Sequence, residues 1–282
     1  MPVTSHAPAG RLQGRVVLIT GGSRGVGAAC ALACAREGAA VVVSAKTMDR
    51  HPTLPGSLAE VVAQIEALGG QALAVPCDVR EADQVQAMVQ AAVDRFGRLD
   101  ALVNNAGAIH WGPVADWSAR RFDLVMGVNV RAAFLATAAA LPHLRVHGGH
   151  VIMMSPPVHP GASPGKAPYL VSKIGMTMLA MAVDAEEVDV AACSLWPVTG
   201  VRTAATLVHG FGDEREWRTP DILADATVAL LARDPRQSPF RAWLDEEVLA
   251  EVGLTDLSDY ACVPGCEPLP MSISLVDPSW KR

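Results

Sequence analysis

Tyr169 and Lys173 are the two residues whose types and spacing best suit proton transfer. They lie four positions apart in the segment APYLVSKIGMTMLAMAV, which reads as a helix, so both side chains share one face, one turn apart. A phenol has a pKa near ~10 and is a weak base at neutral pH, but a neighbouring ammonium group favours the phenolate. The pair therefore predicts general acid–base chemistry, with Tyr169 giving a proton to a carbonyl or taking one from an alcohol.

Ser155 precedes Tyr169 by fourteen residues and ends a predicted strand, the position at which parallel sheets place ligands. Its hydroxyl could donate a hydrogen bond to the reacting oxygen and stabilise the charge that develops there. The alternative is a serine that merely ends the strand before Pro156 and Pro157. Asn129 lies inside a predicted long helix, where asparagine costs helix propensity, so a further use of its side chain is indicated.

The segment TGGSRGVG at residues 20–27 follows the first predicted strand and opens the first predicted helix. Gly21 permits a tight turn, Gly25 lets the backbone approach a pyrophosphate, and Gly27 allows close packing of helix on strand. The helix N-terminus adds free N–H groups and a positive dipole that attract phosphate. Any strand-to-helix turn can carry two glycines, but in this context the segment predicts a dinucleotide phosphate site.

Short β-branched segments alternate with longer alanine-rich segments of helical period along most of the chain. Strands bounded by Gly, Asp or Asn that alternate with helices predict a parallel sheet covered on both faces. Because such crossovers are right-handed, we expect a doubly wound α/β sheet in one Rossmann-like, three-layer domain. The predicted strands are 16–20, 40–45, 71–79, 100–105, 150–155, 188–196 and 240–245, and the predicted helices are one ending near 37, then 57–68, 81–96, a long helix ending near 147, 168–186 and helical stretches between 200 and 235.

The chain divides into a tail (1–14), a catalytic domain (15–250) and a Pro- and Gly-rich C-terminal extension (251–282) expected to pack on the same domain. The net charge of −6 argues against a nucleic-acid-binding protein. No apolar run reaches the ~18 residues of a membrane helix and the N-terminus lacks a signal-peptide pattern, so no membrane insertion is expected. The six cysteines lack zinc-site spacing, so we expect reduced thiols in a cytoplasmic protein, and no metal.

The glycine spacing G-x-x-x-G-x-G, with Thr20 before it, resembles the short-chain dehydrogenase/reductase superfamily. Over residues 14–245 the resemblance is supported by Asp78-Val79, Asn104-Asn105-Ala106-Gly107, Asn129, Ser155 and Tyr169-x-x-x-Lys173. It implies a nicotinamide-dependent oxidoreductase, in which Lys173 also holds the nicotinamide ribose and Asn129 binds a water that relays protons to Lys173. The cofactor-binding residues expected from the glycine turn and the resemblance are Gly21, Ser23, Arg24, Gly25, Val26, Gly27, Lys46, Asp78, Val79, Asn105, Ala106 and Gly107, with Tyr169 and Lys173.

Several loop segments carry a closer likeness. SAKT (44–47), HPTLPG (51–56), MMSPP (153–157) and LWPVT (195–199) resemble the hydroxysteroid-dehydrogenase-like branch, whose larger members carry a sterol-carrier domain after the catalytic one. The chain is expected to be the catalytic unit alone. The family usually has Pro-Gly after the sixth strand, whereas this chain has Pro197-Val198-Thr199-Gly200, which leaves open which of Thr199, Val201 and Thr203 takes each role beside the nicotinamide carboxamide.

The end of the second predicted strand bears on the choice between NAD and NADP. It reads Ser44-Ala45-Lys46, without the carboxylate that would bind a ribose diol. Lys46 and Arg24 could both reach a 2′-phosphate, which favours NADP(H), with NAD as the alternative. Both cations could equally be solvated loop charges, as surface Lys and Arg usually are. Asp78 is, by the resemblance, placed for the adenine amino group.

The expected reaction is reversible hydride transfer between NADP(H) and a hydrophobic alcohol, aldehyde or ketone. Alternatives are a non-catalytic cofactor-binding or redox-sensing protein on the same scaffold, and a relative that uses bound nicotinamide for isomerisation. A homodimer or homotetramer is expected, because the predicted helices at 121–146 and 168–186 carry more apolar surface than one sheet face needs. The candidate substrate-facing residues are His110, Trp111, Val158, His159, Trp196, Phe211 and Trp217.

Overall fold

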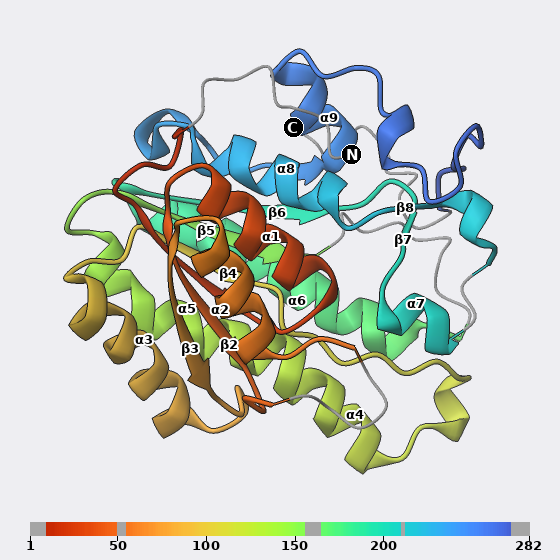
Figure 1. Ribbon diagram of the computed structural model, residues 1–282. Helices are drawn as coiled ribbons and strands as arrows, with labels where there is room; N and C mark the ends of the chain where they lie inside the picture. Colours follow the sequence, from red (N-terminus) through yellow and green to blue (C-terminus); the bar gives the residue numbers. More distant parts are fainter. Residues whose placement is uncertain (1–9, 50–54, 156–164, 210–211, 272–282) are drawn as a thin grey trace.

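The computed structural model describes residues 10–49, 55–155, 165–209 and 212–271, and its centre is a parallel seven-stranded sheet (Figure 1). The strand order is β3-β2-β1-β4-β5-β6-β9, and every neighbouring pair in this sheet runs parallel. This confirms the predicted doubly wound α/β fold. The strands are β1 (Val16–Thr20), β2 (Ala40–Ala45), β3 (Gln71–Pro76), β4 (Ala101–Asn104), β5 (Gly149–Met154), β6 (Val190–Trp196) and β9 (Ala242–Leu244), with a separate pair β7 (Gly200–Val201) and β8 (Trp217–Arg218).

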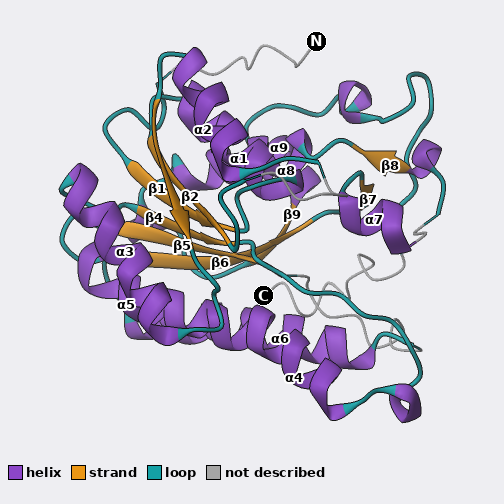
Figure 2. Ribbon diagram, turned by 60° about the horizontal axis from the view of Figure 1, so that its bottom comes forward, coloured by secondary structure: helices purple, strands orange, loops and turns teal. Residues whose placement is uncertain are grey.

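Helices cover both faces of the sheet (Figure 2). Figure 2 shows α1, α2, α8 and α9 above the sheet and α3, α5 and α6 below it, with α4 beside α6. The helices are α1 (Gly25–Arg36), α2 (Leu58–Ala67), α3 (Ala82–Phe96), α4 (Ala119–Met126), α5 (Ala132–Leu144), α6 (Ala167–Glu186), α7 (Ala204–His209), α8 (Asp221–Leu231) and α9 (Asp245–Glu251).

Strand β1 shows why the sequence folds this way. All five of its residues are buried, because parallel strands between two helical layers have no face toward water. Val17 and Ile19 pack toward α1 and α8, while Val16 and Leu18 pack toward α3 and α5. The alternation of strand side chains therefore builds two apolar cores, one on each face of the sheet.

The single long helix predicted to end near residue 147 is interrupted. Helices α4 and α5 are joined by a π-helical turn at Gly127–Arg131, a departure that inserts one residue into the helical ladder and often marks a functional position. The helical run Ala119–Leu144 is long and apolar enough to cross a membrane, and 39% of its most apolar 18-residue stretch is buried inside the protein. One such helix is weak evidence for a span, and α5 packs on β4 and β5 as a core helix.

The segment after α9 packs back onto α8, β8 and the turn that follows β6. Tyr260 is buried and its hydroxyl donates to the carboxylate of Asp225 in α8 at 2.6 Å. Ala261 forms a bridge with Arg218 of β8, and Pro270 forms one with Thr199. The extension thus packs on the domain as far as residue 271, where the described part of the chain ends.

Candidate active site

The glycine turn between β1 and α1 is built as tightly as its sequence suggests. Gly21 and Gly25 have φ values of +68° and +54°, a region that favours glycine. A Cβ on Gly27 would lie 2.3 Å from the carbonyl oxygen of Gly21, so α1 can approach β1 this closely only without a side chain there. The turn leaves a concave backbone surface at the start of α1, which fits the pyrophosphate of a dinucleotide.

Thr20 and Asn105 join the glycine turn to the loop after β4. The Thr20 hydroxyl accepts from the backbone N–H groups of Asn105 and Ala106, at 3.1 Å each. The Asn105 amide donates to the carbonyl oxygens of Thr20 at 2.9 Å and Gly21 at 3.1 Å. The side chain of Asn105 is therefore used to hold the two loops together, and any cofactor contact of this loop falls to Ala106, Gly107 or backbone groups.

Tyr169 and Lys173 lie one turn apart on the inner face of α6, and each is 5% exposed. The Lys173 Nζ lies 5.7 Å from the centre of the Tyr169 ring and donates to the carbonyl oxygen of Met154, at the end of β5, at 2.7 Å. A Cβ on Gly107 would lie 3.9 Å from the same Nζ. The end of β5 thus orients the ammonium group beside the phenol, between the catalytic helix and the loop after β4.

Burial shifts both groups toward their neutral forms. It raises the pKa of Tyr169 above its ordinary value, because the phenolate would lose its hydration. It lowers the pKa of Lys173 to about 8, since the ammonium is also desolvated. Before a ligand adds its own charges, Tyr169 holds its proton and Lys173 is close to half protonation slightly above neutral pH. The site without ligand therefore holds a protonated phenol, the form of Tyr169 that carries a proton to give.

Ser155 follows β5 and is fully buried, but its hydroxyl faces α6. It donates to the backbone oxygen of Lys173 and lies 2.8 Å from the Thr177 hydroxyl. Ser155 does not line the cavity described below. In this arrangement the hydroxyl anchors the catalytic helix to the sheet, and its predicted contact with a reacting oxygen stays a prediction.

Asn129 lies in the π-turn and is fully buried. Its Oδ1 accepts from the backbone N–H of Ala108 at 2.7 Å, and its Nδ2 donates to the Ala108 carbonyl at 3.1 Å and to the Ser172 hydroxyl at 2.8 Å. Ser172 in turn donates to the carbonyl oxygen of Tyr169 at 2.6 Å. Asn129 therefore fastens the loop after β4 to the catalytic helix, and its predicted water relay to Lys173 is not tested by these contacts.

A cavity of about 510 Å³ connects the glycine turn with Tyr169 and Lys173. Arg24, Gly25, Val26, Asn105 and Gly107 line it on the cofactor side. The remaining wall is mostly apolar, and includes Ile109, Trp111, Met154, Lys166, Leu195, Trp196, Pro197, Val201, Thr203, Leu223 and Met271.

Known proteins place this arrangement in a family. The model of the short chain dehydrogenase family matches residues 15–203. The chain belongs to the short-chain dehydrogenase family. Hydroxysteroid dehydrogenase-like protein 2 of Xenopus tropicalis is 41% identical over 266 residues, which cover 93% of this chain and 64% of that protein. The chain is thus a member of the hydroxysteroid-dehydrogenase-like branch and spans less than two thirds of the length of this relative.

Solved structures agree with this assignment. A crystal structure from Xanthomonas campestris superposes with a TM-score of 0.88 at 41% identity, covering 93% of this chain and 98% of the other. A short chain dehydrogenase from Burkholderia cenocepacia in complex with NADP has a TM-score of 0.73 at 27% identity. The match covers 83% of this chain and 97% of the other. A short chain dehydrogenase from Mycobacterium paratuberculosis bound to NAD has a TM-score of 0.71 at 27% identity. The match covers 84% of this chain and 98% of the other. A nicotinamide cofactor follows from the family, and these two structures differ in which one is bound.

Two of the predicted cofactor-binding residues of this short-chain dehydrogenase, Lys46 and Asp78, belong to a charge cluster that the sequence did not predict. Lys46 Nζ lies 3.2 Å from the carboxylate of Asp78, and Arg80 pairs with the same carboxylate at 2.5 Å. These cations hold the pKa of Asp78 well below its ordinary value. Lys46 is 69% exposed in its side chain, and Arg24 makes a long contact of 3.5 Å with the Gly56 carbonyl. Val79, which follows Asp78, and Ser23, which precedes Arg24, are both buried.

Two of the predicted substrate-facing residues, Trp111 and Trp196, line the cavity of the dehydrogenase. His110 instead lies beside Arg121, at 3.2 Å, and packs edge-on against Trp117. Trp217 is buried in β8, where a Cβ on Gly200 would lie 2.4 Å from its ring. The remaining three, Val158, His159 and Phe211, lie outside the described residues.

The turn after β6 is held from two sides by residues that sequence reasoning missed. The Val198 N–H donates to the carboxylate of Asp245 at 3.0 Å, and the Val198 carbonyl accepts from the N–H of Met271 at 2.8 Å. Val201 and Thr203 line the cavity, whereas Thr199 is fully buried and bridges to Pro270. Of these residues, only Asp245 stands out in the sequence, as an acid directly after an apolar strand. Its hydrogen-bond partner Val198, 47 residues away, could not be predicted.

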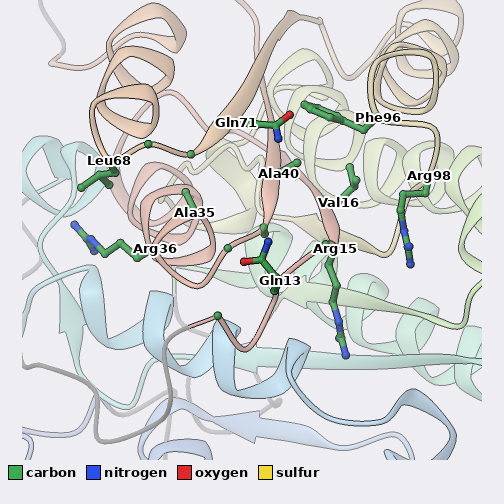
Figure 3. Close-up of a pocket in the computed structure, with 16 residues that line it drawn as sticks. Gln13, Arg15, Val16, Ala35, Arg36, Ala40, Leu68, Gln71, Phe96 and Arg98 are labelled. Atoms are coloured by element: carbon green, nitrogen blue, oxygen red, sulfur yellow. The ribbon is translucent and has the colours of Figure 1, made fainter.

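A second groove, of about 610 Å³, lies at the opposite edge of the sheet, at the amino ends of β1, β2 and β3 (Figure 3). Arg15, Arg36 and Arg98 line it, but Figure 3 shows that the guanidinium group of Arg36 points away from the other two. Arg98 pairs with Asp100, and Arg15 donates to the Leu231 carbonyl. Open α/β sheets bind ligands at their carboxyl ends, so the cavity beside Tyr169 is the candidate active site.

Proposed function

We propose that this dehydrogenase catalyses reversible hydride transfer between NADP(H) and the alcohol/carbonyl pair of a hydrophobic substrate. The observation that carries the proposal is one cavity bordered by both the glycine turn and the buried Tyr169–Lys173 pair. A bound nicotinamide would supply the hydride. The chain itself would orient the substrate, keep water out and supply or remove one proton.

The proton step follows from the geometry of α6. In reduction, the phenol of Tyr169 gives its proton to the carbonyl oxygen, and the nearby Lys173 ammonium stabilises the phenolate that remains. The Met154 carbonyl keeps Lys173 oriented, and the ribose hydroxyls would compete for the same ammonium. In oxidation the steps reverse, with the phenolate taking the proton of the alcohol.

Preference for NADP(H) over NAD is part of the proposal. Arg24 and Lys46 lie near the adenosine end, and β2 ends at Ala45 without an acid at its tip. Asp78 opposes this preference, since its carboxylate already pairs with Lys46 and Arg80. A 2′-phosphate would replace Asp78 as the partner of Lys46, whereas Arg80 would stay with Asp78.

A homodimer or homotetramer is also proposed. Large apolar side chains that are about 40–55% exposed gather on α4, α5 and α6, namely Phe122, Leu124, Phe134, Val171, Met178 and Met181. Such a patch is larger than single exposed residues and is commonly covered by a second copy in closed symmetric assemblies. Light scattering of the purified protein tests this. A cytoplasmic location is proposed as well, supported by six cysteines that are all free thiols.

The non-catalytic alternative has one observation in its favour, the engagement of the Ser155 hydroxyl with α6. A substrate panel of aldehydes, ketones and alcohols, followed by absorbance of NADPH and NADH, separates the two functions. We expect turnover of apolar carbonyl compounds and none after Tyr169→Phe. Tight cofactor binding without turnover of any panel member would contradict the proposed reaction and favour the alternative.

A further inference from the structure

The candidate active site holds three cations and no acid among its described lining residues. The cations are Arg24, Lys166 and Lys173. Arg24 lies at the glycine turn and contacts the Gly56 carbonyl, and Lys173 donates to the Met154 carbonyl beside Tyr169. The cofactor phosphates and the ribose account for the first and the third of these cations, so Lys166 is left without a role in the proposed reaction.

Lys166 lines the same cavity as Tyr169 and contacts it through Trp111. Its Nζ lies 5.7 Å from the centre of the Trp111 ring, and Trp111 packs edge-on against the Tyr169 ring with centres 5.0 Å apart. One aromatic ring therefore separates the ammonium from the catalytic phenol. Among the described residues, the Lys166 ammonium has no hydrogen-bond or ion-pair partner besides its approach to the Trp111 ring, and the residue is half-buried.

We propose that Lys166 is a specificity-determining residue that binds the carboxylate of an oxo acid or hydroxy acid substrate. The carbonyl or alcohol would lie at Tyr169, the apolar body against Trp111, and the carboxylate at Lys166. A half-buried cation bordered by apolar walls binds a carboxylate more strongly than one in open water, because solvent screens it less. The inference rests on the proposed function and names the substrate class for the same site.

The test compares an acid with its neutral ester of the same shape. Terephthalaldehydic acid and its methyl ester are reduced with NADPH by the wild type, Lys166→Met, Lys166→Arg and Arg36→Met. Arg36 is a matched control, since it is an exposed cation at the opposite edge of the sheet. We expect the kcat/KM of the wild type to favour the acid by about tenfold, the order of one charge-assisted contact. Lys166→Met should abolish that preference, and Lys166→Arg and Arg36→Met should retain it, while the ester changes less than about twofold in all variants.

A binding measurement separates this inference from the proposed reaction. Calorimetry of para-toluate and its methyl ester with the enzyme–NADP complex needs no turnover, and we expect the acid to bind more tightly in the wild type but not in Lys166→Met. If the aldehyde of the methyl ester is reduced and the acid has no higher kcat/KM, the role of Lys166 is overturned and the proposed reaction stands. If neither aldehyde is reduced but para-toluate binds through Lys166, the anion subsite stands and the reaction fails. If neither aldehyde is reduced and para-toluate does not bind through Lys166, both the reaction and the anion subsite are overturned.

Discussion

The two regions that border the catalytic cavity are built by different means. The cofactor half, residues 10–155, places its glycine turn and its loop after β4 at the ends of adjacent buried strands. The C-terminal half, residues 197–271, contributes the two-residue strands β7 and β8 near the cavity. Its turn after β6 is held by two hydrogen bonds, one from the Val198 N–H to the Asp245 carboxylate and one from the Met271 N–H to the Val198 carbonyl. The family model covers most of the first region and ends at residue 203. Close packing at the glycines, together with the Thr20 and Asn105 hydrogen bonds, thus forms the cofactor side, whereas the turn on the substrate side depends on a few polar contacts.

The largest expected effect lies where the two regions meet, at the phenol of Tyr169. Tyr169→Phe removes one hydroxyl and should lower kcat about 100- to 10,000-fold, the usual contribution of general acid–base catalysis. Cofactor affinity and the free energy of unfolding should change little, since the ring keeps its contact with Trp111. Steady-state rates on an active substrate, with calorimetric cofactor titration, measure both. Near-normal turnover in the variant would contradict the assignment of the proton donor.

In the cofactor half, Gly27→Ala tests whether steric fit dominates. The new methyl group would lie 2.3 Å from the Gly21 carbonyl oxygen and 2.5 Å from Asn105 Nδ2, so β1, α1 and the β4 loop must separate. We expect the free energy of unfolding to fall by about 1–3 kcal/mol, with weaker binding of both cofactors. Urea unfolding and calorimetry check this. Gly127→Ala is the control, because a methyl group there would meet only Arg80, at 3.9 Å. A Gly27→Ala protein with unchanged stability and affinity would argue against the packing described for the turn.

In the C-terminal half, Asp245→Asn tests the importance of buried polar contacts. Burial raises the pKa of Asp245 to about 7, and its Oδ2 has no hydrogen-bond partner among the described residues. Because this folded-state pKa lies above the unfolded value, the folded protein binds more protons between about pH 4 and pH 7, and its stability falls as the pH rises through that window.

Asparagine keeps an acceptor for Val198 and cannot ionise, so Asp245→Asn should remove that fall. The difference in unfolding free energy between variant and wild type should grow in favour of the variant by a few kcal/mol between about pH 4 and pH 8, at ~1.4 kcal/mol per pKa unit. Urea unfolding across this range measures it, and Asp123→Asn, an exposed carboxylate on α4, is the control. A constant difference between Asp245→Asn and wild type would show that Asp245 titrates normally.

The smallest effect is expected at the adenosine end. Lys46→Ala should weaken NADPH several-fold and leave NADH nearly unchanged, because the cation is well exposed and exposed ion pairs contribute only about 0.2–1 kcal/mol. Titration of both cofactors, with Arg36→Ala as a control, measures the difference. Equal weakening of both cofactors would mean that Lys46 acts through Asp78 rather than through a 2′-phosphate.

Sequence patterns were sufficient for most of the cofactor half. The predicted ranges of β1 and β2 match the structure, because short buried runs rich in β-branched residues favour strands. The shared helix face of Tyr169 and Lys173 was equally predictable, since helical periodicity places residues four apart on one face. The π-helical turn at Gly127–Arg131 could not be predicted, because a regular helix and a π-helical turn have the same residue composition. The contacts of Asn129 with Ala108 and Ser172 are visible only in the structure.

The sequence by itself determined the fold class, the position of the glycine turn and the placement of Tyr169 and Lys173 one turn apart on a helix, all of which follow from local patterns. Only the tertiary structure decided the orientation of the Ser155 hydroxyl toward Lys173 and Thr177 and the clamp on Val198. It also decided the approach of Lys166 to Trp111. The physical reason is range, since periodicity tells which face of an element is buried but not which distant group meets it there. The partners of Val198, at residues 245 and 271, are far from it in the sequence, beyond the range of any local pattern.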